Sequence, residues 1–239
     1  MIYIGIDDTD VIGSPGTNQL ARAIVRRLGH VANGSAHGAI VCRHQLFFDP
    51  RVPYTSQNGS ASIQLPLGET FERDQLIDAV REEMRAFFVE GSDPGLAIAT
   101  TASADMAAFA VRAKSDLVTQ SDARRVAERS GCHLEGLGGT NQGVIGALAA
   151  IALAAAGDDG RVVHMEGWPW PDQFCGVQPV AAVRDRGVTE IRTTSGTGFT
   201  GDVVDVGKHL RPNWRDGHVV LFVEPPVESG LPWRARKLD

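Results

Sequence analysis

The chain has 239 residues, of which 43% are hydrophobic and 22% are charged, and its formal net charge is −6. These proportions are typical of a globular protein, and a chain of this length can bury a core without disulfides or a structural metal. The acidic balance argues against a protein that coats nucleic acid, although it leaves room for a local basic patch. The three separate cysteines form no CxxC pair, which argues against a zinc ribbon and a disulfide framework and indicates a reducing compartment.

The sequence carries no targeting or membrane-spanning signal. It enters a strand-like run at once, without a basic segment followed by a long apolar one. The longest apolar stretch, Val144 to Ala156, is too short to span a bilayer. We therefore expect a cytoplasmic protein with no membrane partner.

The first fifty residues predict a strand, a helix and a second strand. Ile2 to Ile6 is β-rich and runs into carboxylates, so it predicts a buried strand with a polar end. Apolar residues at every fourth position from Leu20 to Leu28 mark one face of a helix. Ile40 to Phe48 is the second strand candidate, and the prolines in Asp49 to Pro53 end it because they lack backbone donors.

Strands and helices continue to alternate up to about residue 156. The expected elements are a half-buried strand at Ser60 to Leu65, a helix at Phe71 to Val89, a strand at Gly95 to Ala99, and helices at Ala104 to Ala113, Ser121 to Ser130 and Val144 to Ala156. Strand-like pieces then dominate, at Arg161 to Met165, Val180 to Val183, Glu190 to Thr193, Val203 to Val206 and Val219 to Val223. We predict an α/β fold, with a mixed α+β arrangement as the alternative. The change to shorter, strand-like segments suggests a division into residues 1–160 and a strand-rich region, 161–239. The second region could complete the same domain as the first.

Three carboxylates follow the first strand, at Asp7, Asp8 and Asp10. Crowded carboxylates repel one another and lose hydration, so a compensating charge is expected. Mg²⁺ suits this role, since proteins hold it with one or two carboxylates together with phosphate oxygens and water. In phosphoryl transfer such an ion neutralises the transferred group. The alternative is a turn in which the aspartates bind nearby backbone amides.

Two glycine-containing segments precede helices and could bind phosphate through backbone amides. In the first, Gly16 is followed by Thr17, whose hydroxyl lies near the carboxylates, although an ordinary helix cap explains this segment alone. The second segment, Gly136 to Gly143, is neither a Walker A loop nor a GxGxxG fingerprint, and a tight loop for helix packing explains it equally well. Its candidate nucleotide-binding residues are Gly138, Gly139, Asn141 and Gly143.

Six short segments occur in a fixed order along the chain. They are Gly5-Ile6-Asp7-Asp8-Thr9-Asp10, Gly16-Thr17-x-x-Leu20-Ala21, Asp49-Pro50-x-Val52-Pro53-Tyr54, Asn58-Gly59, Asp93-Pro94-Gly95 and Gly143-Val144-Ile145-Gly146-Ala147-Leu148-Ala149-Ala150. In this order they resemble the archaeal isoleucine-tRNA agmatinylcytidine synthetase family, which uses ATP to activate a tRNA cytidine and then attaches agmatine. The resemblance covers about residues 1–160, and the collinear order is more specific than any single segment.

The resemblance implies a kinase-like module joined to a ferredoxin-like domain. It implies that Asp7, Asp8 and Asp10 handle Mg²⁺ and the phosphates of ATP, and that Thr17 occupies the place of a phosphorylatable threonine. Asn58, Gly59 and the loop at Gly143 would line the nucleotide site. The chain departs from the family where basic residues are expected, at Thr55-Ser56-Gln57 and at 138–142. We expect no counterpart in these 239 residues for the family's later nucleic-acid-binding and zinc-ribbon domains.

We therefore expect a Mg-dependent, ATP-using phosphoryl-transfer enzyme or ligase. Its acceptor would be a small molecule or a tRNA cytidine, the latter reached with a partner chain that supplies the missing domains. The alternative is a nucleotide- or metal-binding regulatory protein that has lost catalysis, which the missing basic residues favour. A plain RNA-binding module is the third hypothesis, opposed by the acidic balance and the lack of an aromatic and basic strip.

Overall fold

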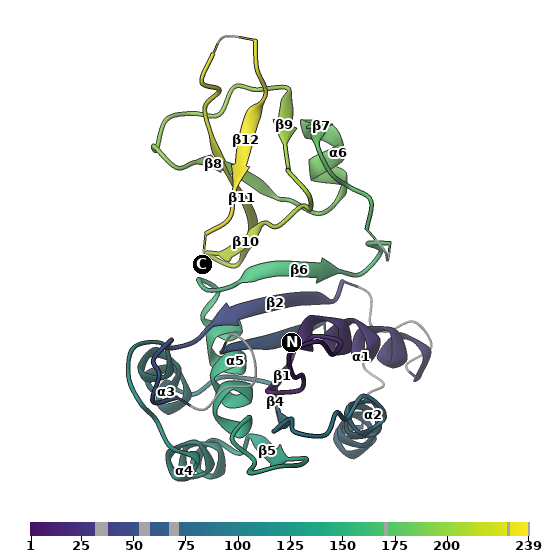
Figure 1. Cartoon of the computed structure of the whole chain (residues 1–239), viewed down its shortest axis with the longest axis vertical. Coiled ribbons are helices and arrows are strands. Elements are labelled where there is room, and N and C mark those ends of the chain that lie inside the picture. The colour runs from purple at the N-terminus through teal and green to yellow at the C-terminus, as the bar shows by residue number, and fades with distance from the viewer. Residues whose placement is uncertain (32–37, 53–57, 67–71, 170–171, 229, 239) are drawn as a thin grey trace.

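The computed structural model describes residues 1–31, 38–52, 58–66, 72–169, 172–228 and 230–238 (Figure 1). Of the predicted features, Pro53-Tyr54, Thr55-Ser56-Gln57 and the first residue of the helix expected from Phe71 lie outside these ranges. No helix within them is both long and apolar enough to cross a membrane.

The N-terminal half is built on an antiparallel sheet. In chain order the elements are β1 (Ile2–Asp7), α1 (Thr17–Val31), β2 (Ile40–Gln45), β3 (Gly59–Leu65), α2 (Arg73–Ala86) and β4 (Gly95–Ala99). The strands lie in the order β4-β1-β3-β2, with β1 antiparallel to both of its neighbours. This is the split βαβ arrangement of ferredoxin-like folds.

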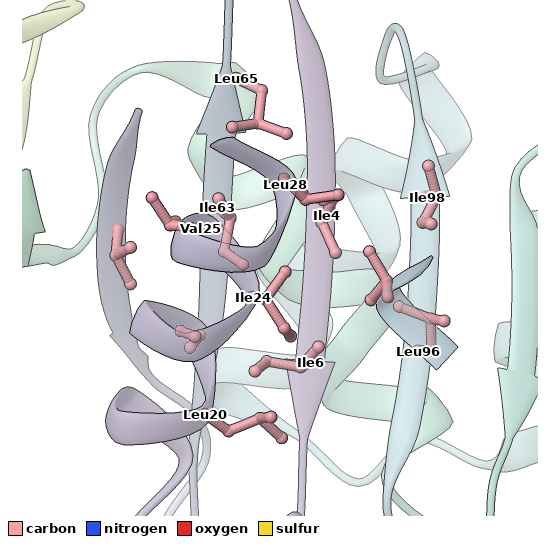
Figure 2. Close-up of a cluster of buried hydrophobic side chains, with 14 of the residues drawn as sticks. Ile4, Ile6, Leu20, Ile24, Val25, Leu28, Ile63, Leu65, Leu96 and Ile98 are labelled. Atoms are coloured by element: carbon pink, nitrogen blue, oxygen red, sulfur yellow. The ribbon is translucent and has the colours of Figure 1, made fainter. Parts of the chain in front are cut away.

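Helices cover both faces of this sheet. On one face α1 and α2 pack against the strands. Figure 2 shows Leu20, Ile24 and Leu28 of α1 directed at β1 and β3, where they meet Ile4 and Ile63. Full burial of each such aliphatic side chain stabilises the fold by roughly 1.5–3 kcal/mol, and the four-residue spacing on α1 predicts this buried face.

The second face is covered by α3 (Ala104–Ser115), α4 (Gln120–Ser130) and α5 (Val144–Ala156), with β5 (His133–Gly136) added at the sheet edge beside β4. The sequence predicts α4 from Ser121. It begins one residue earlier because Thr119 caps it, exchanging hydrogen bonds with Asp122 in a capping box.

Glycines let α5 approach the strands with almost no space between the two backbones. A methyl group at Gly5 would overlap the carbonyl oxygen of Ala147, and one at Gly95 would overlap the backbone of Gly143. A methyl group at Gly146 would overlap the carboxylate of Asp7. Close backbone packing therefore explains these glycines and places the start of α5 directly beside the end of β1.

The C-terminal region extends the same sheet. Its elements are β6 (Arg161–Met165), β7 (Val177–Pro179), α6 (Val180–Asp185), β8 (Glu190–Thr193), β9 (Val203–Asp205), β10 (Asn213–Arg215), β11 (His218–Glu224) and β12 (Trp233–Arg236). β6 pairs with β2 on one side and β10 on the other, and the order continues β10-β11-β12-β9-β7, with β8 beside β11.

A third apolar cluster fills the C-terminal part, around Val204, Leu210 and Leu221. The sheet runs without a break past residue 160, and the division of the chain into two domains remains a prediction. The sequence prediction of a strand at Val180 to Val183 is wrong, because these residues form α6 directly after Pro179. The α/β fold class is confirmed.

Candidate functional site

The polar end of β1 leaves the sheet abruptly. Asp8 has a φ of 50°, a left-handed conformation that aspartate tolerates better than most residues. The amide of Asp93 donates a hydrogen bond of 2.9 Å to the Asp8 carbonyl and fixes this bend. Strained backbone of this kind is concentrated at functional sites.

Asp7 is almost completely buried, with only 5% of its surface exposed, and its carboxylate lies against Gly146. Burial raises the pKa of Asp7 well above its ordinary value, and the charges of Asp8 and Asp10 raise it further. The backbone amide of Asp8 and the positive charge of Arg43 act in the opposite direction. An added cation at this point would therefore stabilise the ionised carboxylate.

Thr17, the first residue of α1, is tied to the acidic segment. Its hydroxyl donates to Oδ1 of Asp10 at 2.7 Å and accepts a hydrogen bond from Thr9 at 3.0 Å. Gly16 lies beside Asp10, and its carbonyl accepts from the amide of Gln19 at 2.7 Å. The predicted proximity of Thr17 to the carboxylates is therefore present in the fold.

Two adjacent pockets open on either side of this segment. The Asp8 pocket, of about 450 Å³, is lined by Asp7, Asp8, Leu46, Phe47, Arg51, Val52, Asn58, Ala113, Asp116, Leu117, Val118, Thr119, Gln120, Ser121, Gln142, Ile145 and Gly146. The Thr17 pocket, of about 520 Å³, is lined by Asp10, Val11, Ile12, Gly13, Ser14, Gly16, Thr17, Asn18, Arg43 and Gly59. The two pockets are adjacent, because Asn58 lines the first and the next residue, Gly59 at the start of β3, lines the second.

Two arginines that the sequence interpretation missed supply positive charge at the pockets. The guanidinium of Arg43, on β2, lies across Gly59 and donates to the side-chain oxygen of Gln45 at 2.9 Å. Arg51 lines the Asp8 pocket and donates to both carboxylate oxygens of Asp49, at 2.7 and 2.9 Å. Neither arginine lies at 55–57 or 138–142, where the resemblance implies basic residues, and the available signal for Arg43 was a charge directly after the apolar start of the strand at 40–45.

The glycine-rich loop before α5 binds a carboxylate of the protein itself. The carboxylate of Asp93 accepts hydrogen bonds from the amides of Thr140 and Asn141, the latter at 3.1 Å, and the amide of Gly143 donates to the Asp93 carbonyl at 3.0 Å. Gly138, Gly139, Asn141 and Gly143 line neither pocket. Their role in nucleotide binding remains a prediction, while Gln142 and Gly146 of the same segment do reach the Asp8 pocket.

The three aspartates are divided between the pockets. Asp7 and Asp8 line the first, whereas Asp10 lines the second and accepts from Thr17. Within the residues that the structure describes, no group of three His, Cys, Asp or Glu side chains could hold a metal ion. Two carboxylates are sufficient for Mg²⁺ when phosphate oxygens complete its shell, so Asp7 and Asp8 fit the ion in the presence of a nucleotide.

A buried histidine lies behind the site on β2. His44 is fully enclosed, and its ring nitrogens lie 2.8 Å from Asp159 Oδ1 and 2.8 Å from Ser62 Oγ. Lys114 also pairs with Asp159. The order Asp-His-Ser matches a hydrolase triad, but His44 and Ser62 are both inaccessible and line no pocket described above. The network is therefore structural.

Lowering the pH is expected to destabilise the fold through His44. Burial lowers the pKa of His44, although the hydrogen bond with Asp159 opposes this. Below the ordinary pKa of about 6.5 the unfolded chain binds a proton that the folded chain rejects, so the free energy of unfolding falls, by at most about 1.4 kcal/mol per pH unit. Urea denaturation at pH 7.5 and 5.5 measures the change. His44→Gln should show a shallower dependence, and an equal slope would contradict this origin.

Comparison with solved structures finds the same fold in tRNA-modifying enzymes. A crystal structure of a tRNA fluorescent labeling enzyme matches with a TM-score of 0.52 and 24% identity, and apo TiaS (tRNAIle2 agmatidine synthetase) with 0.51 and 22%, each over 63% of this chain and 35% of the other. The TiaS–tRNA(Ile2)–ATP complex matches with 0.50 and 24%, over 63% of this chain and 36% of the other.

This chain therefore spans about a third of the length of those proteins. At these identities the likeness shows a shared fold. No protein-family model matches the sequence, and no curated protein matches it.

Proposed function

We propose that this chain is a Mg-dependent, ATP-using enzyme that modifies RNA, related to tRNA agmatidine synthetase. The observation that carries the proposal is the acidic end of β1, which lies between two pockets with the Thr17 hydroxyl held on Asp10. The fold shared with a synthetase crystallised with tRNA and ATP supports it.

The Asp8 pocket fits the nucleotide. Apolar side chains, including Phe47, Val118 and Ile145, offer a surface for the base, and Asn58 and Gln142 offer polar groups beside it. The phosphates would lie toward Asp7 and Asp8. Mg²⁺ held by these two carboxylates would neutralise charge on the phosphates.

Residues around the Thr17 pocket would orient the transferred group. Asp10 accepts the hydrogen bond of Thr17 and Thr9 donates one to the Thr17 oxygen, so one lone pair of that oxygen remains for a phosphate contact. Thr17 would contact a phosphate or accept the phosphoryl group transiently. Arg43 supplies positive charge next to it, which would stabilise developing negative charge on the phosphoryl oxygens. The acceptor that enters this pocket would be a tRNA cytidine.

A nucleotide-binding protein without catalysis is the second candidate. It is favoured by the Asp93 carboxylate, which occupies the loop amides that would otherwise be open to phosphate. Thermal unfolding with and without ATP and Mg²⁺ tests binding for both candidates. Phosphorus NMR of ATP turnover, with bulk tRNA and with candidate amines, then distinguishes them: nucleotide binding without turnover supports the second candidate.

Thr17→Ala is expected to lower ATP turnover about 100-fold and to leave ATP affinity within about twofold, because the hydroxyl acts on the reacting phosphate more than on the bound nucleotide. Steady-state turnover and ATP titration measure the two effects. Thr17→Ser keeps the hydroxyl and should retain most of the activity. Equal activity in the alanine variant would remove Thr17 from the mechanism.

A further inference from the structure

A cation-rich pocket lies in the C-terminal region, which the proposed catalytic chemistry does not use. Lys208, His209 and Arg211 line it from the segment between β9 and β10, and Arg236 and Lys237 line it from the end of β12, around a cavity of about 150 Å³. We call it the basic pocket. It shares no lining residue with the Asp8 pocket or the Thr17 pocket. In Figure 1 the chain passes from β12 to the C-terminus beside β10.

Most of these positive charges have no carboxylate partner. Glu224 pairs with Arg236 at 3.1 Å. Over the described part of the chain, no carboxylate forms an ion pair with Lys208, Arg211 or Lys237. Both lysines are exposed to solvent. The pocket thus presents concentrated positive charge on a chain whose net charge is −6.

The positive charge extends from the pocket to α1 and β6. Burial lowers the pKa of Arg211, and the charge of Arg161 lowers it further. Burial also lowers the pKa of Arg22, and the charge of Arg211 lowers that pKa further. Arg22 reaches β6, where it donates to the Val163 carbonyl at 3.0 Å.

An acid opposes this repulsion only in part. Asp172 raises the pKa of Arg22, His209 and Arg211, but it already pairs with Arg186 at 3.1 Å. Cations drawn from α1, β6 and the C-terminal strands therefore repel one another. A ligand with several linked negative charges would relieve this repulsion.

We propose that the basic pocket binds the phosphodiester backbone of the RNA substrate. The inference rests on the proposed function for the identity of the polyanion as RNA. The spread of cations over several elements favours a chain of phosphates over a single small anion. Trp233, the aromatic residue of β12, packs edge-on against Phe199 with ring centroids 5.1 Å apart, so we expect contacts with the RNA backbone more than with stacked bases.

A double variant, Lys208→Gln with Lys237→Gln, tests the site, since both side chains are exposed and the fold should be unaffected. Bulk tRNA is the probe, and fluorescence anisotropy is measured between 50 and 200 mM salt. Loss of two phosphate contacts should weaken binding about tenfold and lower the slope of log affinity against log salt by about 1.4–1.8. The thermal shift with ATP and Mg²⁺ should not change.

The matched control is Arg85→Gln with Arg124→Gln, which removes the same charge from α2 and α4, at the end of the molecule away from the C-terminal strands (Figure 1). It should retain the wild-type affinity and slope. The site is overturned if the lysine variant binds tRNA as the wild type does, if the control loses as much affinity, or if the wild type binds no tRNA. If the wild type does not bind ATP but its tRNA binding depends on the two lysines, the proposed function is overturned and the RNA site is still supported.

Discussion

Asp8→Asn is expected to abolish Mg-dependent ATP binding and leave the fold intact. Asparagine has nearly the same shape and also tolerates the left-handed backbone at this position, so the bend after β1 is kept while one negative charge is lost. With ATP at about 100 times its dissociation constant, ligand binding stabilises the wild type by about 2.7 kcal/mol. For a chain of this size that corresponds to a rise of about 5–10 °C in the midpoint of thermal unfolding.

The asparagine variant should show no such rise, while its midpoint without ligand should match that of the wild type. Asp202→Asn removes one exposed carboxylate from the C-terminal region and should keep the full response to ATP and Mg²⁺. A wild-type response in Asp8→Asn would show that the metal is not held at this strand end.

Gly5→Ala is expected to lower the free energy of unfolding strongly. Its methyl group would overlap the carbonyl oxygen of Ala147 and crowd Ile151, and a backbone carbonyl within α5 cannot move as a flexible side chain can. Overpacking in a core costs about 1–3 kcal/mol, and we expect the upper end here. The midpoint of thermal unfolding should fall by about 6–12 °C.

Chemical denaturation measures this loss as a free energy. Gly198→Ala is the matched control, because no atom lies within 4 Å of the added methyl group, and its effect should stay below about 0.5 kcal/mol. A similarly small effect of Gly5→Ala would mean that the backbone of Gly5 does not lie against the carbonyl of Ala147.

The elements of the N-terminal half could be predicted because their patterns are local. The four-residue spacing in α1 and the β-rich run of β1 each reflect burial of one face, which a short window of sequence records. The strand predicted at Val180 to Val183 is wrong because four small apolar residues fit a short helix as well as a strand.

The candidate site was predicted only where its parts are close in sequence. Asp7, Asp8, Asp10 and Thr17 fall within eleven positions, and the structure brings Asp10 and Thr17 into contact. The carboxylate of Asp93 accepts hydrogen bonds from loop amides 47 and 48 positions away in the chain, and no local pattern records that pairing. The basic pocket was not predicted for a related reason. Its charges come from two segments of the C-terminal region and act together with that of Arg22, which is far away in the sequence.

The pairing of β2 with β6 makes residue 160 a poor place to shorten the protein. β2 positions Arg43 at the Thr17 pocket, and its edge facing away from β3 forms hydrogen bonds with β6. Deleting everything after α5 would leave a row of N–H and C=O groups on β2 open to solvent and uncover Cys42, which packs in the third apolar cluster. Such an edge recruits strands from other molecules, so the truncated protein would tend to aggregate before ATP binding or turnover could be assayed.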